Sequence, residues 1–584
     1  MPAPLLSIRF FRCGILFITF FFFLSLSSYT QIPKHELRAV WISPTSGDWP
    51  TSTDIEEQQR SLVDILDNLQ KHNFTTVFFQ IRSRGNTFYK SSIEPWSPQL
   101  SGVLGKDPGW DPLAFAVEEA HKRGLELHAW FNVAKVWGAD NLPLHQQHVT
   151  QAHHDWVKQF ENEWWLDMGN PEAREYTKNL VKEIVNSYDV DGVHFDYVRY
   201  PSERFDDWNS FSRWSDGMDR AEWRRKNITS FVRACYEFIQ KEKPWVKVGA
   251  AVLGIYQSIN GAQSTFNGYS GVFQDPRGWM RDGILDYATP QLYWTIGEQK
   301  NPNDPDFELL CSDWVRENYG RHVYIGIAAY REKIQNELDE QIELTRTSQA
   351  NGQVFFRYEH TATLFDQIQK AYRYPALVPQ MLWKDSIPPN NPKNISIDAD
   401  DKSDVLIKWS APEIPADKEK PYHYIVYRLP DKNITTRRAE HIAAILPATQ
   451  FSFHDETSNR KEYFYTVTAV DRAGNESGVS EHPFGKIQTL FSRYAKPNTS
   501  ALLVQNFPNP VLSTTYIAFE LSQRNVVSIT VKHSITLQET TIVNEIKEPG
   551  IHIVAFDATK FPAGQIEYRL QSGETIVTRM MEKK

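Results

Sequence analysis

Eight short β-rich runs, each separated from the next by a helical pattern, constrain the fold of this chain more than any other feature. The runs occupy residues 36–43, 75–82, 126–133, 191–198, 246–254, 285–294, 323–330 and 352–359. Strict alternation of strand and helix is typical of parallel sheets, because each helix returns the chain to the start of the next strand. Eight such units favour a closed (β/α)8 barrel over an open doubly wound sheet. No glycine-rich phosphate loop follows any of the runs, which weakens the nucleotide-binding alternative.

The segments between the runs carry apolar residues at the spacing of one helix face, as in Leu62, Ile65, Leu66 and Leu69. Two of these segments begin with a cap residue followed by proline, at Asp111 and at Asn170. The predicted barrel covers residues 31–384, and the rest of the chain shows alternating patterns and turns with no long helix. We therefore predict an α/β barrel followed by two small all-β sandwich domains.

The first thirty residues are predicted to be a secretory signal peptide. Arg9 and Arg12 precede an apolar run over residues 14–26, and small residues follow it. The run is short for a membrane span, and no later stretch approaches eighteen continuous apolar residues. We expect an exported protein of the periplasm, the outer-membrane surface or the extracellular space, without a membrane span.

Charge and cysteine usage exclude several classes of function. The formal net charge is −9, and loss of the signal would make it more negative, which argues against a nucleic-acid partner. Only Cys235 and Cys311 follow the signal, too few for a disulfide framework and without metal-ligand spacing, so we predict that both are buried as apolar residues. Most of the eighteen tryptophans must pack in cores, but a minority on a cleft could stack against sugar rings.

Two C-terminal segments resemble known domain families. Residues 385–486 contain "VLIKWSAP", "YHYIVYRLP" and "EYFYTVTAVDRAGNES", which resemble a fibronectin type III domain, for which a spacer role is expected. Residues 487–584 contain "NFPNP", "PAGQIEYRL" and a basic end, which resemble the C-terminal sorting domain of proteins exported by the type IX system. The second resemblance implies the secretion machinery as a partner.

Alternation within the strands predicts where the site lies. In the fourth run His194 and Asp196 share one face, whereas Val193 and Phe195 share the other. The same division recurs on three other runs, whose polar inward positions include Gln80, Arg82, His128, Trp130, Asn132, Gln291 and Tyr293. These polar groups come near the C-terminal ends of the strands, the end at which (β/α)8 barrels carry their sites. Because unpaired buried charges are costly, their convergence indicates a ligand-binding cleft.

Asp196 is the carboxylate best placed at a strand end, and it could act as a nucleophile, as a general base or as the group that orients a substrate hydroxyl. Glycoside hydrolysis requires two carboxyl groups. Glu359, at the end of the eighth run, is the first candidate for the second catalytic carboxyl, although pairing with a nearby arginine is an equal alternative. Asp275 precedes a proline and is predicted to cap a helix, whereas Asp48, Asp54 and Glu94 remain open as loop candidates.

Seven blocks of the barrel resemble the glycosyl-hydrolase-like 10 family, also described as domain of unknown function 187. They are "ELRAVWIS", "FFQIRSRGNTFYKSSIEPWSPQLSG", "GLELHAWFN", "DGVHFDYVRYP", "NITSFVR", "DPRGWMRDGILDYATPQLYW" and "VYIGIAAYR". The resemblance implies a (β/α)8 glycoside hydrolase of bacterial envelopes, in some members similar to enzymes that cut peptide-free peptidoglycan strands. It also implies that Asp196 is catalytic. The substrate-binding residues that we predict are Arg82, His128, Trp130, Asn132, His194, Tyr197, Arg199, Gln291, Tyr293 and Trp294.

The sequence therefore predicts an exported glycoside hydrolase that cleaves an amino-sugar glycan with two carboxyl groups. We expect no metal and no organic cofactor, because His128 and His194 lack a third ligand at a recognisable spacing. Two alternatives stay open: a glycan-binding envelope protein on a barrel without catalysis, and a hydrolase of another polysaccharide. A monomer is expected, with the glycan substrate as its main partner.

Overall fold

A computed structural model describes residues 32–297, 305–399, 405–430, 437–456, 463–479, 501–506 and 509–584. The predicted signal peptide, residues 1–30, lies outside the described residues. Among the helices of these ranges, none combines the length and the apolar character that a bilayer span requires.

Eight parallel strands form the closed barrel that the sequence predicts. Each strand pairs with the next along the chain, and the last one pairs with the first. The strands are β1 (Leu37–Ile42), β2 (Thr76–Ser83), β4 (Glu126–Asn132), β8 (Gly192–Asp196), β9 (Lys247–Leu253), β10 (Tyr287–Gln291), β11 (His322–Ile327) and β12 (Gly352–Phe356). Six of these strands fall within a predicted run, and β2 and β11 each extend one residue beyond theirs, so the (β/α)8 prediction is confirmed.

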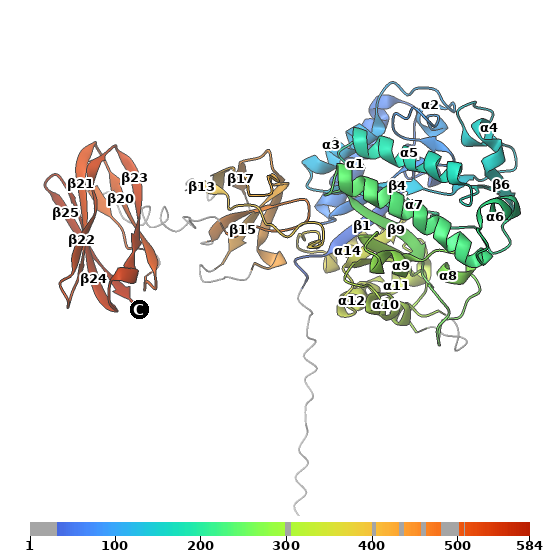
Figure 1. The fold of residues 1–584 in the computed structure, drawn as a ribbon. Helices are drawn as coiled ribbons and strands as arrows, with labels where there is room; N and C mark the ends of the chain where they lie inside the picture. Colours follow the sequence, from blue (N-terminus) through green and yellow to red (C-terminus); the bar gives the residue numbers. More distant parts are fainter. Residues whose placement is uncertain are drawn as a thin grey trace, which may run out of the picture. The chain divides into compact units, whose positions relative to one another are not determined.

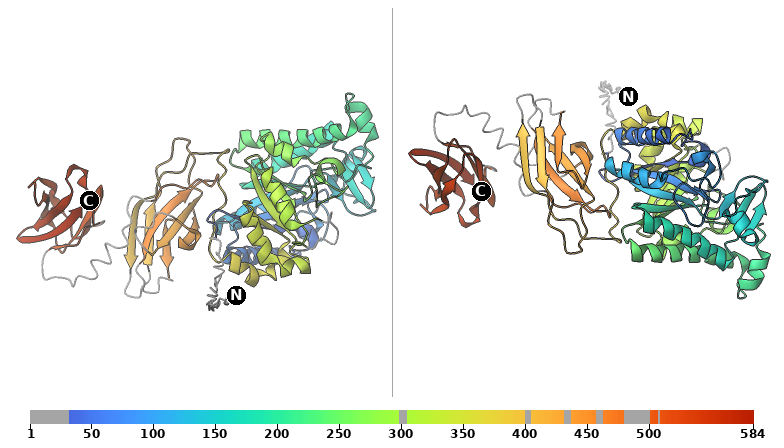
Figure 2. Two further views of the ribbon diagram at one scale, coloured as in Figure 1. Left: turned by 90° about the horizontal axis from the view of Figure 1, so that it is seen from below. Right: turned by 90° about the horizontal axis from the view of Figure 1, so that it is seen from above.

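Helices surround the strands on all sides, as Figures 1 and 2 show. One principal helix follows each strand: α1 (Ile55–Lys71), α3 (Pro112–Lys122), α5 (Pro171–Ser187), α7 (Arg220–Glu242), α9 (Pro276–Arg281), α10 (Phe307–Arg316), α12 (Leu338–Thr347) and α14 (Phe365–Ala371). The predicted caps are confirmed, because Asp111 accepts a hydrogen bond from Ala114 N and Asn170 accepts one from Glu172 N. Asp275 caps α9 by accepting from Gly278 N.

Shorter elements lie in the connections. The helices are α2 (Pro98–Ser101), α4 (Val149–Ala152), α6 (Trp208–Trp214), α8 (Gly268–Gly271), α11 (Glu332–Asn336) and α13 (Tyr358–Ala362), with single 3-10 turns η1 (Pro44–Ser46) and η2 (His154–Trp156). The strands are β3 (Asn86–Thr87), β5 (Lys135–Trp137), β6 (Val157–Phe160) and β7 (Glu163–Leu166). The last three form a separate antiparallel sheet in the order β5-β7-β6.

Strand alternation divides the apolar residues into two cores. Trp41, Phe78 and Tyr287 belong to a cluster that fills the inside of the barrel. Val193 and Phe195 belong to the larger cluster between the strands and the helices. The inward face of β8 therefore carries the polar residues, as its sequence parity predicts.

Acidic residues at the N-terminal end of the barrel hold strand starts in place. Asp191 Oδ2 accepts a hydrogen bond from Leu127 N at 2.8 Å, and Asp286 Oδ2 accepts one from Val248 N at 2.8 Å. Glu126 pairs with Lys247 at the same end. These carboxylates therefore have a structural role.

Small antiparallel sheets follow the barrel. The first two have the orders β13-β14-β17 and β16-β15-β18, and the next two have the orders β19-β20-β23 and β22-β21-β24-β25. Their elements are β13 (Lys393–Ala399), β14 (Val405–Ser410), β15 (His423–Leu429), η3 (Ala439–His441), β16 (Ile442–Pro447), β17 (Ser452–Asp455), β18 (Phe464–Val470), β19 (Ala501–Leu503), β20 (Thr514–Leu521), β21 (Asn525–His533), β22 (Glu539–Lys547), β23 (Gly550–Asp557), η4 (Ala558–Lys560), β24 (Gly564–Ser572) and β25 (Thr575–Lys583). The fibronectin-like and sorting-like assignments stay predictions.

Cys235 and Cys311, both in the barrel, are buried as predicted, and neither forms a disulfide bond.

Candidate active site

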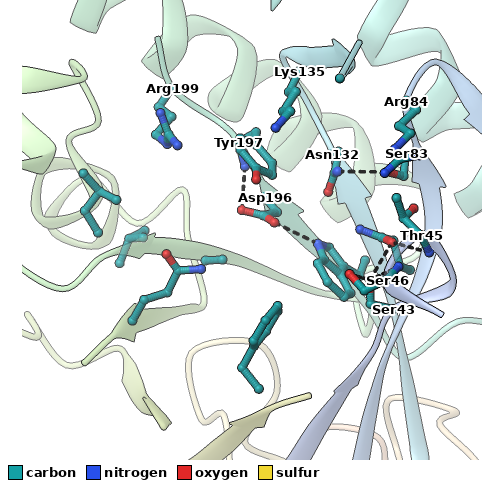
Figure 3. A pocket seen from close by; sticks show the side chains of 18 of the residues that line it. Ser43, Thr45, Ser46, Ser83, Arg84, Asn132, Lys135, Asp196, Tyr197 and Arg199 are labelled. Carbon is teal, nitrogen blue, oxygen red and sulfur yellow. Dashed lines mark hydrogen bonds between the residues drawn. The ribbon is translucent and has the colours of Figure 1, made fainter. Parts of the chain in front are cut away.

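A cavity of about 420 Å³ opens at the C-terminal ends of the barrel strands. Its wall includes Ser43, Thr45, Ser46, Gln80, Ser83, Arg84, Trp130, Asn132, Lys135, Gly138, Glu163, Asp196, Tyr197, Arg199, Ala251, Val252, Leu253, Gln274, Gln291, Tyr293 and Phe356. Seven of the twelve predicted site residues are among them: Trp130, Asn132, Asp196, Tyr197, Arg199, Gln291 and Tyr293. Figure 3 shows how the labelled side chains surround this space.

Asp196 is the last residue of β8, and its half-buried carboxyl group faces the cavity. Oδ1 accepts a hydrogen bond from Tyr197 N at 2.7 Å, and Oδ2 accepts one from Trp130 Nε1 at 3.2 Å. Tyr197 adopts a left-handed φ of 49°, an uncommon and strained conformation for an aromatic residue that ends the strand directly after the carboxylate. Burial raises the pKa of Asp196, while these two hydrogen bonds and nearby cations oppose the rise.

Glu163 is the other carboxylic acid in the described wall of the cavity. It lies on β7 and accepts hydrogen bonds from Trp165 Nε1 at 3.0 Å and from the ammonium group of Lys135 on the neighbouring strand β5. Nζ of Lys135 in turn lies 5.1 Å from the ring centroid of Tyr197. Lys135 therefore links the Glu163 carboxylate to the turn that follows Asp196.

Asn132 supplies a polar atom that is ready for a ligand. It pairs with Asp196 across the β4–β8 ladder, and its Nδ2 donates to Ser83 Oγ at 3.3 Å. The Oδ1 atom is buried and has no hydrogen-bond partner among the described residues. A buried polar atom without a partner is costly, and a substrate N–H or O–H group in the cavity would satisfy it.

His128 and His194, predicted to bind substrate, instead form a continuous hydrogen-bonded chain below the cavity. Trp41 Nε1 donates to His194 Nε2 at 3.1 Å, because an indole nitrogen can only donate. His194 Nδ1–H therefore donates to the Tyr287 oxygen at 3.3 Å, and the Tyr287 hydroxyl donates to His128 Nδ1 at 2.7 Å. His128 Nε2–H then donates to Glu126 at 3.2 Å. Both nitrogens of each histidine are occupied, and neither ring lines the cavity.

Two glycines make room for this chain inside the barrel. A Cβ atom on Gly192 would lie 2.7 Å from His128 Nδ1, and one on Gly249 would lie 1.9 Å from Tyr287 Cζ. Any side chain at these positions would displace the rings. The sequence therefore provides the space as well as the polar groups.

Three further predicted residues lie outside the cavity wall. Arg82 is completely buried in a two-pronged ion pair with Glu94, at 2.8 Å and 2.5 Å. Trp294 is half-buried and packs against the large apolar core. Glu359 has a side chain that is 61% exposed, and it accepts a hydrogen bond from Arg357 Nη2 at 2.5 Å. The structure thus places Glu359 in the arginine pairing that the sequence left as its alternative.

Comparison with known proteins identifies the family. The model of the family described as glycosyl hydrolase-like 10 matches residues 36–343, more than half of the chain. The chain belongs to the glycosyl hydrolase-like 10 family. It is 34% identical over 486 residues to "Glycosyl hydrolase YngK" of Bacillus subtilis (strain 168), which covers 76% of this chain and 92% of the relative. "Glycosyl hydrolase DigH" of Escherichia coli (strain K12) is 32% identical over 390 residues, which cover 59% of this chain and 88% of the relative.

Solved structures add little to this assignment. The endo-beta-1,4-mannanase from Thermotoga petrophila is 11% identical and has a TM-score of 0.36, with 95% of this chain and 98% of that chain covered. A TM-score of this size supports no inference about activity.

Lys135 and Glu163 are two site residues of this glycosyl hydrolase-like 10 chain that the sequence did not predict. Both belong to the sheet β5-β7-β6, which is inserted between β4 and α5. Two features could have drawn attention to them: the unusual length of that connection, and its position after a strand end, where barrel loops build sites.

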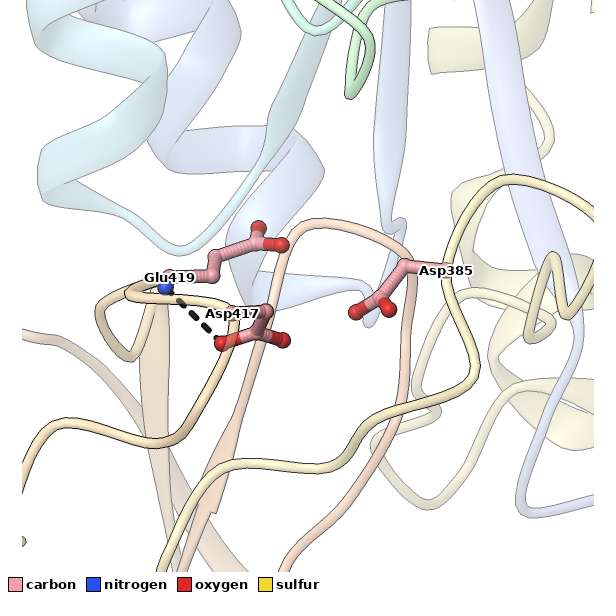
Figure 4. A group of neighbouring side chains, drawn as sticks. All are labelled: Asp385, Asp417 and Glu419. Atoms are coloured by element: carbon pink, nitrogen blue, oxygen red, sulfur yellow. Dashed lines mark hydrogen bonds between the residues drawn. The ribbon is translucent and has the colours of Figure 1, made fainter.

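One group of carboxylates has the spacing of a metal site, but it lies outside the barrel. Oxygen atoms of Asp385, Asp417 and Glu419 lie within 4.8 Å of one another, as Figure 4 shows. Asp417 accepts a hydrogen bond from Glu419 N at 3.0 Å, and Asp385 accepts one from Ile387 N at 3.1 Å. Such bonds to the backbone are those of ordinary acidic turns, so the cluster by itself indicates no metal.

Proposed function

We propose that this glycosyl hydrolase-like 10 protein is a glycoside hydrolase that cleaves an amino-sugar glycan, with peptide-free peptidoglycan strands as its substrate. The observation that carries the proposal is the pair of carboxylic acids, Asp196 and Glu163, in the wall of one cavity at the site-bearing end of the barrel. The family match and two relatives named glycosyl hydrolases support the same class of reaction.

The two carboxyl groups are in different environments, which suggests different roles. Burial raises the pKa of Asp196, which favours the protonated form that a general acid needs. Glu163 instead forms an ion pair with Lys135. In this proposal Asp196 donates its proton to the glycosidic oxygen as the bond to the anomeric carbon breaks. Glu163 either takes a proton from the water that attacks that carbon or attacks it directly, and the anomeric form of the product distinguishes these routes.

Aromatic and amide groups complete a sugar-binding surface in this proposal. Trp130 and Tyr293 line the cavity and can pack against the apolar faces of sugar rings. Asn132 offers its unpartnered Oδ1 to an N–H or O–H group of the substrate. The acetamido N–H of an amino sugar is one such donor, and the comparison with neutral polysaccharides tests this choice.

The test compares purified wild-type protein with variants of the candidate acids. Peptide-free peptidoglycan strands, chitin oligomers and neutral polysaccharides serve as substrates, with products read by mass spectrometry. Asp196→Asn and Glu163→Gln should each lower turnover of the strands by about 10²- to 10⁴-fold. Glu161→Gln is the matched control, since Glu161 lies two residues from Glu163 and has a 69% exposed side chain.

Two outcomes would contradict parts of this proposal. If Glu359→Gln abolishes turnover and Glu163→Gln does not, the second carboxyl is the one predicted from sequence. If the wild-type protein binds strands but releases no product from any substrate, the chain is a glycan-binding protein.

We further propose that the hydrolase acts outside the cytoplasm. The signal-like first thirty residues and the sorting-like C-terminal segment support this location. Fractionation of cells that express the full chain, and the chain without residues 1–30, tests it, because only the full chain should leave the cytoplasm.

A further inference from the structure

Arg199 is the half-buried arginine in the described cavity wall, and its charge has no acidic partner among the described residues. The residue follows β8 and lines the cavity, and its Nη1 donates a hydrogen bond to Tyr200 O at 3.0 Å. Among the described residues, no carboxylate lies within the 4.0 Å ion-pair distance of its guanidinium group. Two other arginines near this barrel end are paired, Arg82 with Glu94 and Arg357 with Glu359, whereas the exposed Arg84 forms no ion pair with a described residue.

Aromatic rings hold the Arg199 guanidinium in a fixed position. Its central carbon lies 5.2 Å from the ring centroid of Trp165, 5.2 Å from that of Tyr197 and 5.7 Å from that of Phe266. Cation–π contacts of this kind orient the planar group, but they satisfy none of its N–H donors. Figure 3 shows Arg199 beside Tyr197, on the opposite side of that ring from Asn132.

The charges of the cavity wall favour an anionic ligand. The described wall carries three cations, Arg84, Lys135 and Arg199, and two acids, Asp196 and Glu163. Lys135 pairs with Glu163, which leaves two arginines against the single acid Asp196. The wall therefore carries an excess of positive charge even when both acids are ionised, in a protein whose net charge is −9. Arg199 is half-buried, and withdrawing a guanidinium from water is costly unless a carboxylate or phosphate pairs with it.

We infer that Arg199 is a specificity-determining residue that binds the free carboxylate of an acidic amino sugar. The inference rests on the proposed function, because peptide-free peptidoglycan carries a lactyl carboxylate on every second sugar. A stem peptide converts that carboxylate into an amide. The amide has no charge and can offer a guanidinium only a neutral hydrogen bond, which is weaker than an ion pair. Arg199 thereby lets the cavity distinguish peptide-free strands from strands that carry peptides.

The experiment compares two forms of one substrate. Soluble peptide-free strands are used as prepared, or after their carboxyl groups are converted to primary amides with carbodiimide and ammonia. The wild-type protein should show a kcat/KM about 10- to 100-fold higher for the carboxylate form, the size expected of charge-assisted hydrogen bonds. Arg199→Gln should reduce this ratio to within about threefold of one, and Arg199→Lys should keep part of it, because lysine retains the charge and loses the planar fork.

Arg84→Gln is the matched comparison, because it removes one positive charge from an exposed position of the same wall. It should change the ratio by less than about threefold, since an exposed charge is screened by water and salt. A purely structural role of Arg199 would lower turnover of both substrates equally and leave their ratio unchanged.

The decisive quantity is the ratio of kcat/KM for the carboxylate form to that for the amide form. The inference is overturned if this ratio is near one in the wild type, if Arg199→Gln leaves it unchanged, or if Arg84→Gln lowers it as much as Arg199→Gln does. The proposed function fails separately, if neither form of the strands is cleaved. In that case calorimetric binding of the same two preparations to the wild type and to Arg199→Gln still decides the role of Arg199. Tighter binding of the carboxylate form, lost in the variant, supports it, and equal binding of the two forms rejects it.

Discussion

The indole N–H of Trp130 donates a hydrogen bond to Oδ2 of Asp196 across the β4–β8 pair, at 3.2 Å. Trp130 lies opposite His194 in the ladder, and His194 is two residues before Asp196. The Trp130 ring therefore reaches toward the cavity from below the carboxylate. The contact gives Asp196 an apolar wall and one hydrogen-bond donor at the same time. The wall raises the pKa of the carboxyl group, and the donor limits the rise.

Trp130→Phe should move the pH dependence of hydrolysis. The variant keeps an aromatic wall but removes a donor that stabilises the ionised carboxylate, so the pKa of Asp196 should rise further. If Asp196 is the general acid, the basic limb of the kcat/KM profile then moves to higher pH by about one unit. Trp110→Phe is the control, because Trp110 donates its indole N–H to Gln58 and does not line the cavity. A basic limb that stays in place in Trp130→Phe would remove Asp196 from the acid role.

Asn132→Leu should separate activity from stability. The change removes a buried Oδ1 that has no partner among the described residues and keeps a side chain of similar size. The change also removes the Nδ2 hydrogen bond to Ser83, at a cost of about 1 kcal/mol that loss of the unsatisfied Oδ1 offsets, so the free energy of unfolding should change little. Loss of a substrate hydrogen bond should lower kcat/KM by about 2- to 10-fold. Thermal unfolding and steady-state kinetics on the same preparation test this. A variant that is less stable and equally active would show that Asn132 serves the fold and not the ligand.

Strand alternation predicted the barrel and the position of Asp196, because a strand period of two assigns every residue to one face. It did not predict height along the barrel. His128 and Asn132 share a face but are four residues apart. At the rise per residue of a β-strand, His128 lies about 13 Å deeper in the barrel, where it contacts Tyr287 instead of solvent. At Arg82 the β2–β4 register shifts, and the side chain turns to Glu94.

Glu163 escaped prediction for a different reason. Its position depends on how an inserted sheet folds back over the barrel end, which is a matter of tertiary packing. No spacing within "ENEWWL" marks one glutamate as facing a cavity and the other as facing solvent. By contrast, Asp111 and Asn170 were predicted correctly as caps, because their signal lies within four consecutive residues.

Arg82→Met should destabilise the protein without directly affecting substrate binding. The change leaves Glu94 as a buried carboxylate without its arginine, at a cost of about 3–5 kcal/mol in the free energy of unfolding. The double variant Arg82→Met with Glu94→Met should recover at least half of this loss. Urea unfolding followed by tryptophan fluorescence measures both. Arg204→Met, which breaks an exposed pair with Glu161, should cost less than about 1 kcal/mol.

If Arg82 bound the substrate directly, as the sequence analysis expected, a different pattern would appear. Arg82→Met would then raise KM strongly with little change in the urea midpoint. The double variant would bind substrate no better than the single one. The structure predicts the opposite order of effects, since Arg82 Nε and Nη2 donate to Glu94 and Nη1 donates to the backbone carbonyl groups of Asn132 and Val133.

His194→Gln should change how stability depends on pH. Burial holds the pKa of His194 well below its usual value of 6.5, so the folded protein keeps the ring neutral while the unfolded chain binds a proton. The stability that the neutral ring contributes is therefore present above pH 6.5 and is lost as the pH falls below it, by up to about 1.4 kcal/mol per pH unit for one proton. His194→Gln should lower the free energy of unfolding at pH 7.5, because Trp41 loses the ring nitrogen that accepts its hydrogen bond. Below pH 6 the free energy of unfolding should fall less steeply with pH than in the wild type, because one proton fewer is bound on unfolding. His322→Gln should reduce this slope similarly, since burial lowers the pKa of His322 to about 3. Free energies of unfolding in urea between pH 7.5 and 5 measure the slope, and an unchanged slope in His194→Gln would mean that this ring is not held neutral in the fold.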